Sequence, residues 1–204
     1  MTSTHSNCDR LTGFRALAFD FDGTLVDTLA LHYEAYRVVF GRLGLDLSEE
    51  RFYSNIGGKA TEAIPLFLGG RACAASVAEI HAMKKDEIAR LFVDAPLRVF
   101  PAARLLGMFA GRLPMALVSS GSRPGIEQLL ERLGWSSMFD VVVTGEDTPD
   151  SKPDPSPYLL AAARLGIPPS EIAAFEDTAA GIQSAKSAGM AIFNVAENPS
   201  SLLP

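Results

Sequence analysis

The chain has 204 residues, 48% of them hydrophobic and 21% charged, an ordinary balance for a globular protein with one core and a modest insertion. Its net charge of -6, without a basic stripe, argues against nucleic-acid binding as the main task. The two cysteines, Cys8 and Cys73, indicate no disulfide framework and suit a reducing cytoplasm. Neither a signal peptide nor a bilayer-length apolar run is evident, so we expect a cytoplasmic protein without membrane contact.

Residues 1–12 are polar and are predicted to form a disordered tail. The apolar run from Phe14 to Phe19 then predicts a buried strand, which ends in the sequence DFDGT at residues 20–24. Open α/β sheets bind their ligands at the carboxyl ends of parallel strands. Because two crowded carboxylates repel each other, a divalent cation bound together with a phosphate would offset their charge. The alternative interpretation is a plain polar turn, since Asp and Gly are common turn residues.

The segment 27–99 shows helical periodicity instead of strand alternation. Its apolar residues recur at steps of three and four, and serine or glycine stands at several expected helix ends. Four helices are predicted: one from Leu29 to Gly44, one beginning at Ser48, one over residues 61–68 with Pro65 near its first turn, and one over residues 76–92.

After Pro101 short apolar runs alternate with helical patterns, which is typical of βαβ units and a parallel sheet. Strands are predicted at residues 115–118, 141–143, 172–175 and 191–195, and helices at residues 126–133, 158–165 and 179–188. The sequence therefore predicts an α/β fold with a Rossmann-like parallel core, formed by residues 13–26 and 100–204. A helical domain of residues 27–99 interrupts this core after the first strand.

Four strand ends carry polar residues suited to phosphate chemistry. Asp20 and Asp22 follow the first core strand, Ser119 the second, and Glu176-Asp177 the fourth, while Lys152 lies in the proline-stiffened loop after the third. In a parallel sheet these ends face one crevice. Magnesium prefers oxygen ligands and often binds through one or two carboxylates and a substrate phosphate. Taken singly, these residues also fit a turn serine, a surface lysine and an acidic helix cap, but their joint order along the chain favours a single site.

The chain resembles the haloacid dehalogenase-like (HAD) superfamily phosphatases, in the branch that includes β-phosphoglucomutase and phosphoglycolate phosphatase. The resemblance covers Phe14 to Val195 and rests on four motifs: DFDGT at residues 20–24, Ser119, Lys152 within SKPDP, and FEDT at residues 175–178. Gly181-Ile182 matches this branch as well. The resemblance implies that the helical insertion is a cap domain.

The resemblance also implies residue roles. Asp20 would be the nucleophile that forms an aspartyl-phosphate, and Asp22 would be the general acid and base. Ser119, Ser120 and Lys152 would hold the phosphoryl oxygens. Magnesium would be bound by Asp20, the main-chain carbonyl of Asp22, Glu176 and Asp177.

In the expected cap, His32, Lys59 and Lys85 are candidate substrate contacts. The arginine that mutases of this branch carry after the cap's glycine loop is absent, and Ala60 stands near its place. We therefore expect a Mg²⁺-dependent phosphatase acting on a small phosphorylated metabolite such as a sugar phosphate or phosphoglycolate. A β-phosphoglucomutase-type mutase and a non-enzymatic phospho-acceptor signalling module are the alternatives. The sequence is compatible with a monomer and with a homodimer.

Overall fold

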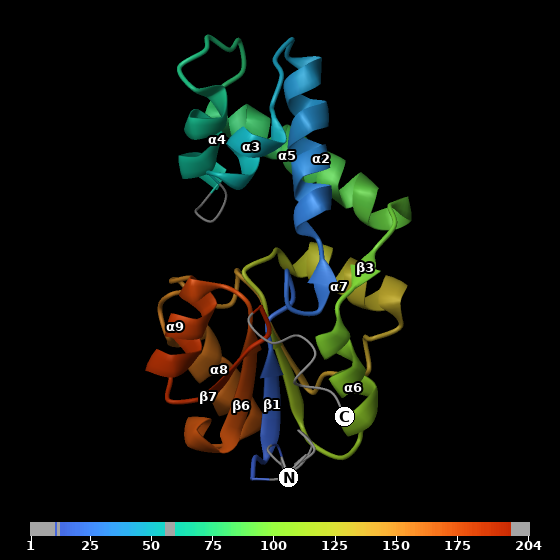
Figure 1. Ribbon diagram of the computed structural model, residues 1–204, viewed down its shortest axis with the longest axis vertical. Helices are drawn as coiled ribbons and strands as arrows, with labels where there is room; N and C mark the ends of the chain where they lie inside the picture. The colour runs from blue at the N-terminus through green and yellow to red at the C-terminus, as the bar shows by residue number, and fades with distance from the viewer. Residues whose placement is uncertain (1–10, 12, 56–59, 197–204) are drawn as a thin grey trace, which may run out of the picture. The chain divides into compact units, whose positions relative to one another are not determined.

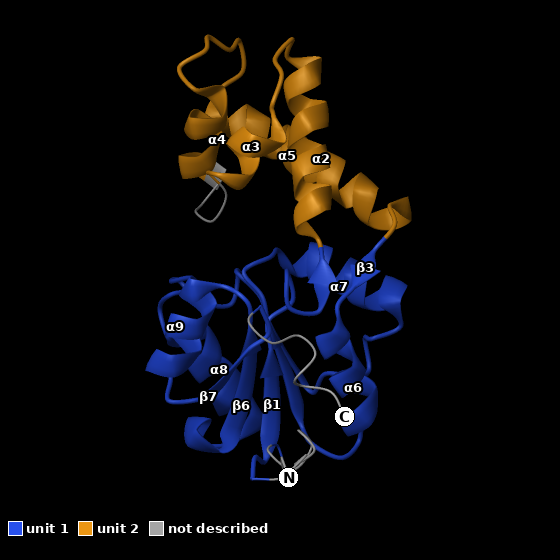
Figure 2. Cartoon of the chain, viewed as in Figure 1, with its two compact units in different colours: residues 1–27, 97–204 blue, residues 28–96 orange. Residues whose placement is uncertain are grey.

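The computed structural model describes residues 11, 13–55 and 60–196. The chain forms two compact units, which Figure 2 distinguishes by colour. Unit 1 contains residues 1–27 and 97–204, and unit 2 contains residues 28–96. Unit 2 is therefore an insertion in the chain of unit 1.

Unit 1 is built on a five-stranded parallel sheet with strand order β5-β4-β1-β6-β7 (Figure 1). Its strands are β1 (Ala16–Phe19), β4 (Met115–Val118), β5 (Val141–Val143), β6 (Ile172–Glu176) and β7 (Ala191–Asn194). All five coincide with the apolar runs of the sequence, and the expected α/β fold class is confirmed. Every residue of β1, β4 and β6 is buried, because helices cover a parallel sheet on both faces.

Alternate residues of the strands supply the two faces of the sheet. On one face, Ala16 and Ala18 of β1 belong to a cluster that includes Tyr158 of α8 and Ala185 of α9. On the other face, the ring of Phe175 stacks on that of Phe19 at 4.7 Å. The helices of unit 1 are α6 (Arg104–Phe109), α7 (Arg123–Leu133), α8 (Ser156–Leu165) and α9 (Ala179–Ser187), with short 3-10 turns at Pro101–Ala103 and Pro169–Glu171.

A two-stranded antiparallel ribbon marks both crossings between the units. It consists of β2 (Val26–Asp27) and β3 (Arg98–Val99), and both strands belong to unit 1. The expected insertion of residues 27–99 is thus longer at each end than unit 2, because strand pairing keeps Asp27 and residues 97–99 with unit 1. The two crossings of the chain therefore lie side by side within unit 1.

Unit 2 contains four helices around its own core: α2 (Leu29–Arg42), α3 (Glu49–Tyr53), α4 (Ala60–Leu68) and α5 (Val77–Asp94). Its buried cluster includes Tyr36, Phe52 and Phe67. Ser48 caps α3, and Ser76 forms a capping box with Glu79 at the start of α5.

Two details differ from the expectations. Pro65, expected near the first turn, is the sixth residue of α4, which begins at Ala60 and so one residue earlier than predicted. Leu11, expected within a disordered tail, is buried, and its carbonyl accepts a hydrogen bond from the Phe14 N–H. The other residues of that tail lie outside the described part of the chain. In the described residues, no helix has the length and apolar character needed to cross a membrane.

Candidate active site

The register of the sheet brings the sequence-predicted polar residues of unit 1 to one edge. Phe19 of β1 is level with Leu117 of β4 and with Phe175 of β6. The next residues, Asp20 just after β1 and Glu176 at the end of β6, therefore lie next to each other. The Asp20 N–H donates to the Phe175 carbonyl at 3.0 Å, which continues the pairing of the two strands up to the site.

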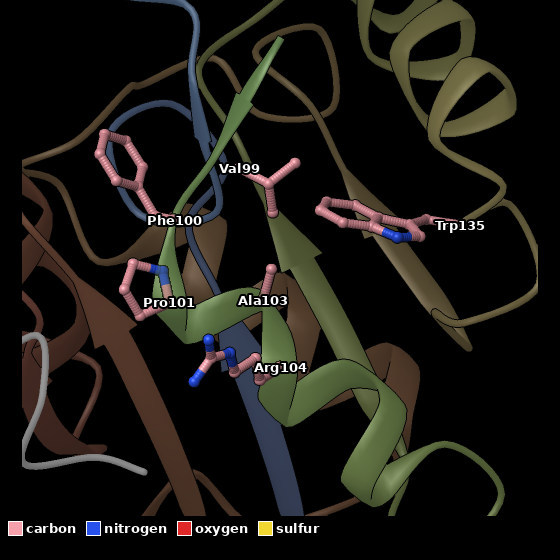
Figure 3. Close-up of a pocket in the computed structure, with 6 residues that line it drawn as sticks. All are labelled: Val99, Phe100, Pro101, Ala103, Arg104 and Trp135. Atoms are coloured by element: carbon pink, nitrogen blue, oxygen red, sulfur yellow. The ribbon is translucent and has the colours of Figure 1, made fainter.

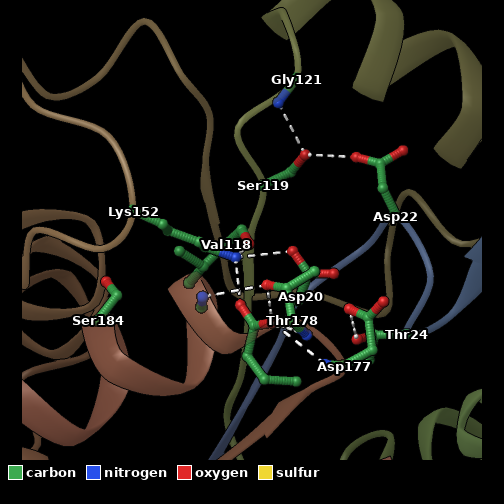
Figure 4. Close-up of polar contacts among 12 residues, drawn as sticks. Asp20, Asp22, Thr24, Val118, Ser119, Gly121, Lys152, Asp177, Thr178 and Ser184 are labelled. Carbon is green, nitrogen blue, oxygen red and sulfur yellow. Dashed lines mark hydrogen bonds and ion pairs between the residues drawn. The ribbon is translucent and has the colours of Figure 1, made fainter. Parts of the chain in front are cut away.

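Lys152 reaches this edge from the loop between β5 and α8. Its ammonium donates to Asp20 Oδ1 at 2.7 Å and to the Val118 carbonyl at 2.9 Å (Figure 4). It also donates to Glu176 Oε1 at 2.6 Å. A lysine has three N–H donors, so all three are used. Burial alone would lower the pKa of Lys152, but the carboxylates, Asp20 foremost, outweigh it and hold that pKa well above its ordinary value.

Asp20 combines burial with an unused oxygen. Its Oδ1 accepts a hydrogen bond from Lys152. Among the buried side-chain nitrogen and oxygen atoms of residues 13–55 and 60–196, Oδ2 of Asp20 is the one without a hydrogen-bond partner. Burial raises the pKa of Asp20 well above its ordinary value, although Lys152 counteracts this effect. A buried oxygen without a partner is costly unless a ligand or ion completes its coordination.

Glu176 is fully buried, and both of its oxygens accept hydrogen bonds. Oε1 accepts from Lys152 and from the Tyr158 hydroxyl at 2.8 Å, while Oε2 accepts from the Thr178 hydroxyl at 3.3 Å and the Asp177 N–H at 3.2 Å. Burial raises the pKa of Tyr158 well above its ordinary value, which keeps the hydroxyl a proton donor. The first turn of α9 passes so close that a Cβ on Gly181 would overlap the Glu176 carboxylate.

Asp177 completes an acidic group. Its Oδ1 accepts from the Thr24 hydroxyl at 3.2 Å, and burial, followed by the charge of Glu176, raises its pKa. One carboxylate oxygen from each of Asp20, Glu176 and Asp177 lies within 4.8 Å of the others. The three carboxylates have one buried ammonium, that of Lys152, near them. These residues fit a divalent cation, which prefers oxygen ligands.

Asp22 and Ser119 form a second contact at the same edge. The Ser119 hydroxyl donates to Asp22 Oδ2 at 3.1 Å and accepts from the Gly121 N–H at 2.9 Å (Figure 4). The Asp22 carboxylate does not belong to the three-carboxylate group, which agrees with a ligand role for its main-chain carbonyl alone. Ser120 follows in the same loop with an exposed side chain.

The three residues of the helical domain that are expected to contact substrate differ from one another in their surroundings. His32 of α2 accepts a hydrogen bond at Nδ1 from Lys84 of α5, at 2.7 Å. Lys85, the lysine named from the sequence, is exposed, because consecutive residues of a helix point in different directions. Lys59 lies outside the described residues.

A hollow in unit 1 that is lined by aromatic and apolar side chains does not include these residues. It has a volume of about 300 Å³. Figure 3 shows Trp135 and Phe100 at its sides. Its lining contains none of the acidic residues described above, so the candidate site rests on the polar cluster and not on this hollow. The lining residues are Val99, Phe100, Pro101, Ala103, Arg104 and Trp135.

Sequence reasoning missed Tyr158, Thr24 and Lys84. Tyr158 lies on the apolar side of a predicted helix, a position typical of a core residue, and its contact with Glu176 spans 18 residues. Thr24 belongs to the DFDGT motif, but the sequence does not indicate that its hydroxyl donates to Asp177. Lys84 and Lys85 are adjacent, and the helical pattern alone did not separate the lysine that meets α2 from its exposed neighbour.

Known proteins resemble this chain over most of its length. Residues 14–189 match the haloacid dehalogenase-like hydrolase family. The chain is 33% identical over 177 residues to a phosphorylated carbohydrates phosphatase of Thermotoga maritima, covering 86% of this chain and 82% of the relative. It is 34% identical over 178 residues to the fructose-1-phosphate phosphatase YqaB of Escherichia coli, covering 87% and 94%.

A solved structure shows the same fold. CbbY from Rhodobacter sphaeroides, crystallised in complex with phosphate, superimposes with a TM-score of 0.77 at 29% identity, over 88% of this chain and 84% of that chain. The family match, the relatives and this structure agree with the resemblance drawn from the four motifs. The expected family branch and the expected class, a phosphoric monoester hydrolase, are confirmed.

Proposed function

This chain belongs to the haloacid dehalogenase-like hydrolases, and we propose that it is a magnesium-dependent phosphatase that hydrolyses a small phosphorylated metabolite through an aspartyl-phosphate on Asp20. The observation that carries the proposal is the asymmetry of Asp20: Oδ1 is held by Lys152, while the buried Oδ2 has no partner in the described residues. An oriented carboxylate with one free oxygen is suited to nucleophilic attack.

In the first step, Asp20 Oδ2 attacks the phosphorus and the bond from phosphorus to the leaving oxygen breaks. The leaving oxygen takes the proton of the Asp22 carboxyl group. Phosphoryl transfer depends chiefly on positioning and on neutralising the equatorial oxygens. Lys152 and Ser119, with the main chain at Ser120, are the donors that we assign to those oxygens.

In the second step, a water molecule attacks the phosphorus of the aspartyl-phosphate. Asp22, now a carboxylate, accepts a proton from this water, and the bond between phosphorus and Asp20 Oδ2 breaks. Inorganic phosphate leaves, and both aspartates return to their starting state. Splitting one difficult displacement into two easier ones is the advantage of the covalent route.

Magnesium is the cation that we propose for the acidic group. Asp20, Asp177, Glu176 and the main-chain carbonyl of Asp22 would hold it. When bound, it supplies positive charge that offsets the carboxylates and the phosphoryl oxygens. The proposal is supported by the acidic group itself, in which one carboxylate oxygen from each of Asp20, Glu176 and Asp177 lies within 4.8 Å of the others.

The substrate class that we propose is a phosphorylated carbohydrate or a similarly small phosphate ester. It is supported by the names of the two relatives, which refer to phosphorylated carbohydrates and to fructose 1-phosphate. We propose that unit 2 is a cap that selects the substrate, with His32, Lys59 and Lys85 as candidate contacts. The hydrogen bond to His32 favours Lys84 over Lys85 in this role.

A substrate screen tests the proposed function. Phosphate release is measured from a panel of sugar phosphates, phosphoglycolate and an aryl phosphate, with Mg²⁺ and with a chelator. We expect release from at least one monoester and loss of activity in the chelator. The same panel is analysed for isomeric products, since a mutase would move the phosphate to a second hydroxyl instead of to water. Full activity without divalent cation, or isomerisation without net hydrolysis, would contradict the proposal.

A further inference from the structure

Tyr158 is a buried polar residue of the site that the proposed mechanism leaves without a role. Its side chain is fully buried in the core cluster of unit 1. The hydroxyl donates to Glu176 Oε1 at 2.8 Å, and the ring centroid lies 5.1 Å from Lys152 Nζ. Tyr158 therefore touches both partners of the Lys152–Glu176 ion pair.

Lys152 has no spare donor for a substrate. Its three N–H groups are used by Asp20, Val118 and Glu176. To hold a phosphoryl oxygen, the ammonium must give up one of these acceptors. Glu176 Oε1 accepts hydrogen bonds from both Lys152 and the Tyr158 hydroxyl. If Lys152 turned away from Glu176, this oxygen would therefore still have the hydrogen bond from Tyr158.

The other oxygen of Glu176 is already satisfied. Oε2 accepts from the Thr178 hydroxyl and from the main-chain N–H groups of Asp177 and Thr178 at 3.2–3.5 Å. The carboxylate is therefore anchored to the start of α9 and is not free to follow the ammonium. If Lys152 left and neither another donor nor a cation contacted Oε1, this atom would be a buried charged oxygen without a partner, which is strongly unfavourable.

We propose that Tyr158 is a positioning residue that keeps Glu176 Oε1 hydrogen-bonded while Lys152 transfers one N–H donor from Glu176 to a phosphoryl oxygen. This inference rests on the proposed function, because it assumes that Lys152 binds phosphate. The tyrosine ring is fixed by the core, so its hydroxyl remains in place when the ammonium moves. The hydroxyl thereby lowers the free-energy cost of phosphate binding and takes no part in bond making.

The variant Tyr158→Phe isolates the hydroxyl, because the ring next to Lys152 is kept. We expect the inhibition constant of inorganic phosphate and the KM for a phosphate monoester to rise about fivefold, the equivalent of one hydrogen bond of about 1 kcal/mol, with a smaller change in kcat. The phosphate affinity is measured by inhibition and by titration calorimetry of the full chain, with and without Mg²⁺. Unchanged phosphate affinity and KM would overturn the inference and leave the hydroxyl a purely structural group.

Tyr33→Phe is the matched control. Its hydroxyl donates to the neutral Leu47 carbonyl at 3.1 Å within unit 2, so the variant loses a tyrosine hydrogen bond away from Lys152. We expect a smaller fall in melting temperature than for Tyr158→Phe, because that bond is made to a neutral acceptor, and no change in phosphate affinity. An equal loss of phosphate affinity in both variants would contradict a specific role for Tyr158.

A second variant pair tests the reason given for the effect. In Glu176→Gln the buried charge is absent, so Tyr158→Phe should add no further loss of phosphate affinity in that background. Additive losses would overturn the inference. If the wild-type chain released no phosphate from any monoester, the proposed function itself would fail. If the wild-type chain released phosphate and Tyr158→Phe had wild-type phosphate affinity, only the proposed role of Tyr158 would fail.

Discussion

Lys152 Nζ lies 2.7 Å from Asp20 Oδ1, although 132 residues separate the two in the chain. The ammonium is buried between Asp20 and Glu176, both of them buried carboxylates. Such an arrangement is stable only while each charge keeps its partners. It holds Asp20 Oδ1, while Oδ2, the atom that we propose as the nucleophile, has no hydrogen-bond partner in the described residues.

Asp22→Asn should lower kcat by about 10²- to 10⁴-fold, because an amide can neither protonate the leaving oxygen nor accept a proton from water. The fold should persist, since Asn can still accept the hydrogen bond from Ser119. Phosphate release under saturating substrate is the measurement. The exposed Asp86→Asn serves as the control and should behave as wild type. A kcat near wild type for Asp22→Asn would mean that another group moves the proton.

Gly181→Ala should destabilise the chain by about 1–3 kcal/mol and displace Glu176, because the added methyl group overlaps its carboxylate. Gly107→Ala is the matched helical control, since its added Cβ meets no atom within 4 Å apart from its chain neighbours and the nearby backbone of its own helix. That variant should be neutral or stabilised by up to about 1 kcal/mol. Urea unfolding measures both free energies of unfolding. Equal stability of the two variants would show that the approach of α9 to Glu176 is looser than described.

His32 should make the stability of the chain sensitive to acid. Burial, with Lys84 adding, lowers the pKa of His32 to about 3 from 6.5. Because the folded-state value is the lower one, the unfolded chain binds more protons between these values, and stability is lost as the pH falls through this window. It is fully present above pH 6.5.

His32→Asn removes this titration. Its free energy of unfolding should fall less steeply than that of the wild type between pH 6.5 and pH 4.5, while both chains should change alike between pH 7 and pH 8. Urea unfolding across this range is the measurement. Parallel curves over the whole range would argue that His32 is protonated as easily in the folded chain as in the unfolded one.

The core of the fold could be predicted from the sequence because its strands are unbroken apolar runs ending in distinctive turns. Residues 115–118, for example, are all buried and lead directly into Ser119. The ribbon of Val26–Asp27 and Arg98–Val99 could not be predicted, because two residues have no periodicity. The start of α4, by contrast, lies within one residue of its predicted position.

The site could be predicted to the extent that its residues follow strands. The positions of Asp20, Ser119 and Glu176 follow from the parallel register alone. Contacts made from helices could not be predicted in the same way. The Tyr158 hydroxyl and the Lys84 ammonium reach their partners because of how α8 meets β6 and α5 meets α2, and tertiary packing decides such contacts.

The central claim is that Asp20 becomes phosphorylated, and intact-mass analysis of acid-quenched enzyme tests it most directly. Wild-type chain mixed with a substrate identified by the screen and Mg²⁺ should gain the mass of one phosphoryl group, and peptide mapping should place that group on Asp20. Asp20→Asn should gain no mass and release no phosphate. A phosphoryl group on any other residue, or turnover by Asp20→Asn near the wild-type rate, would contradict the account.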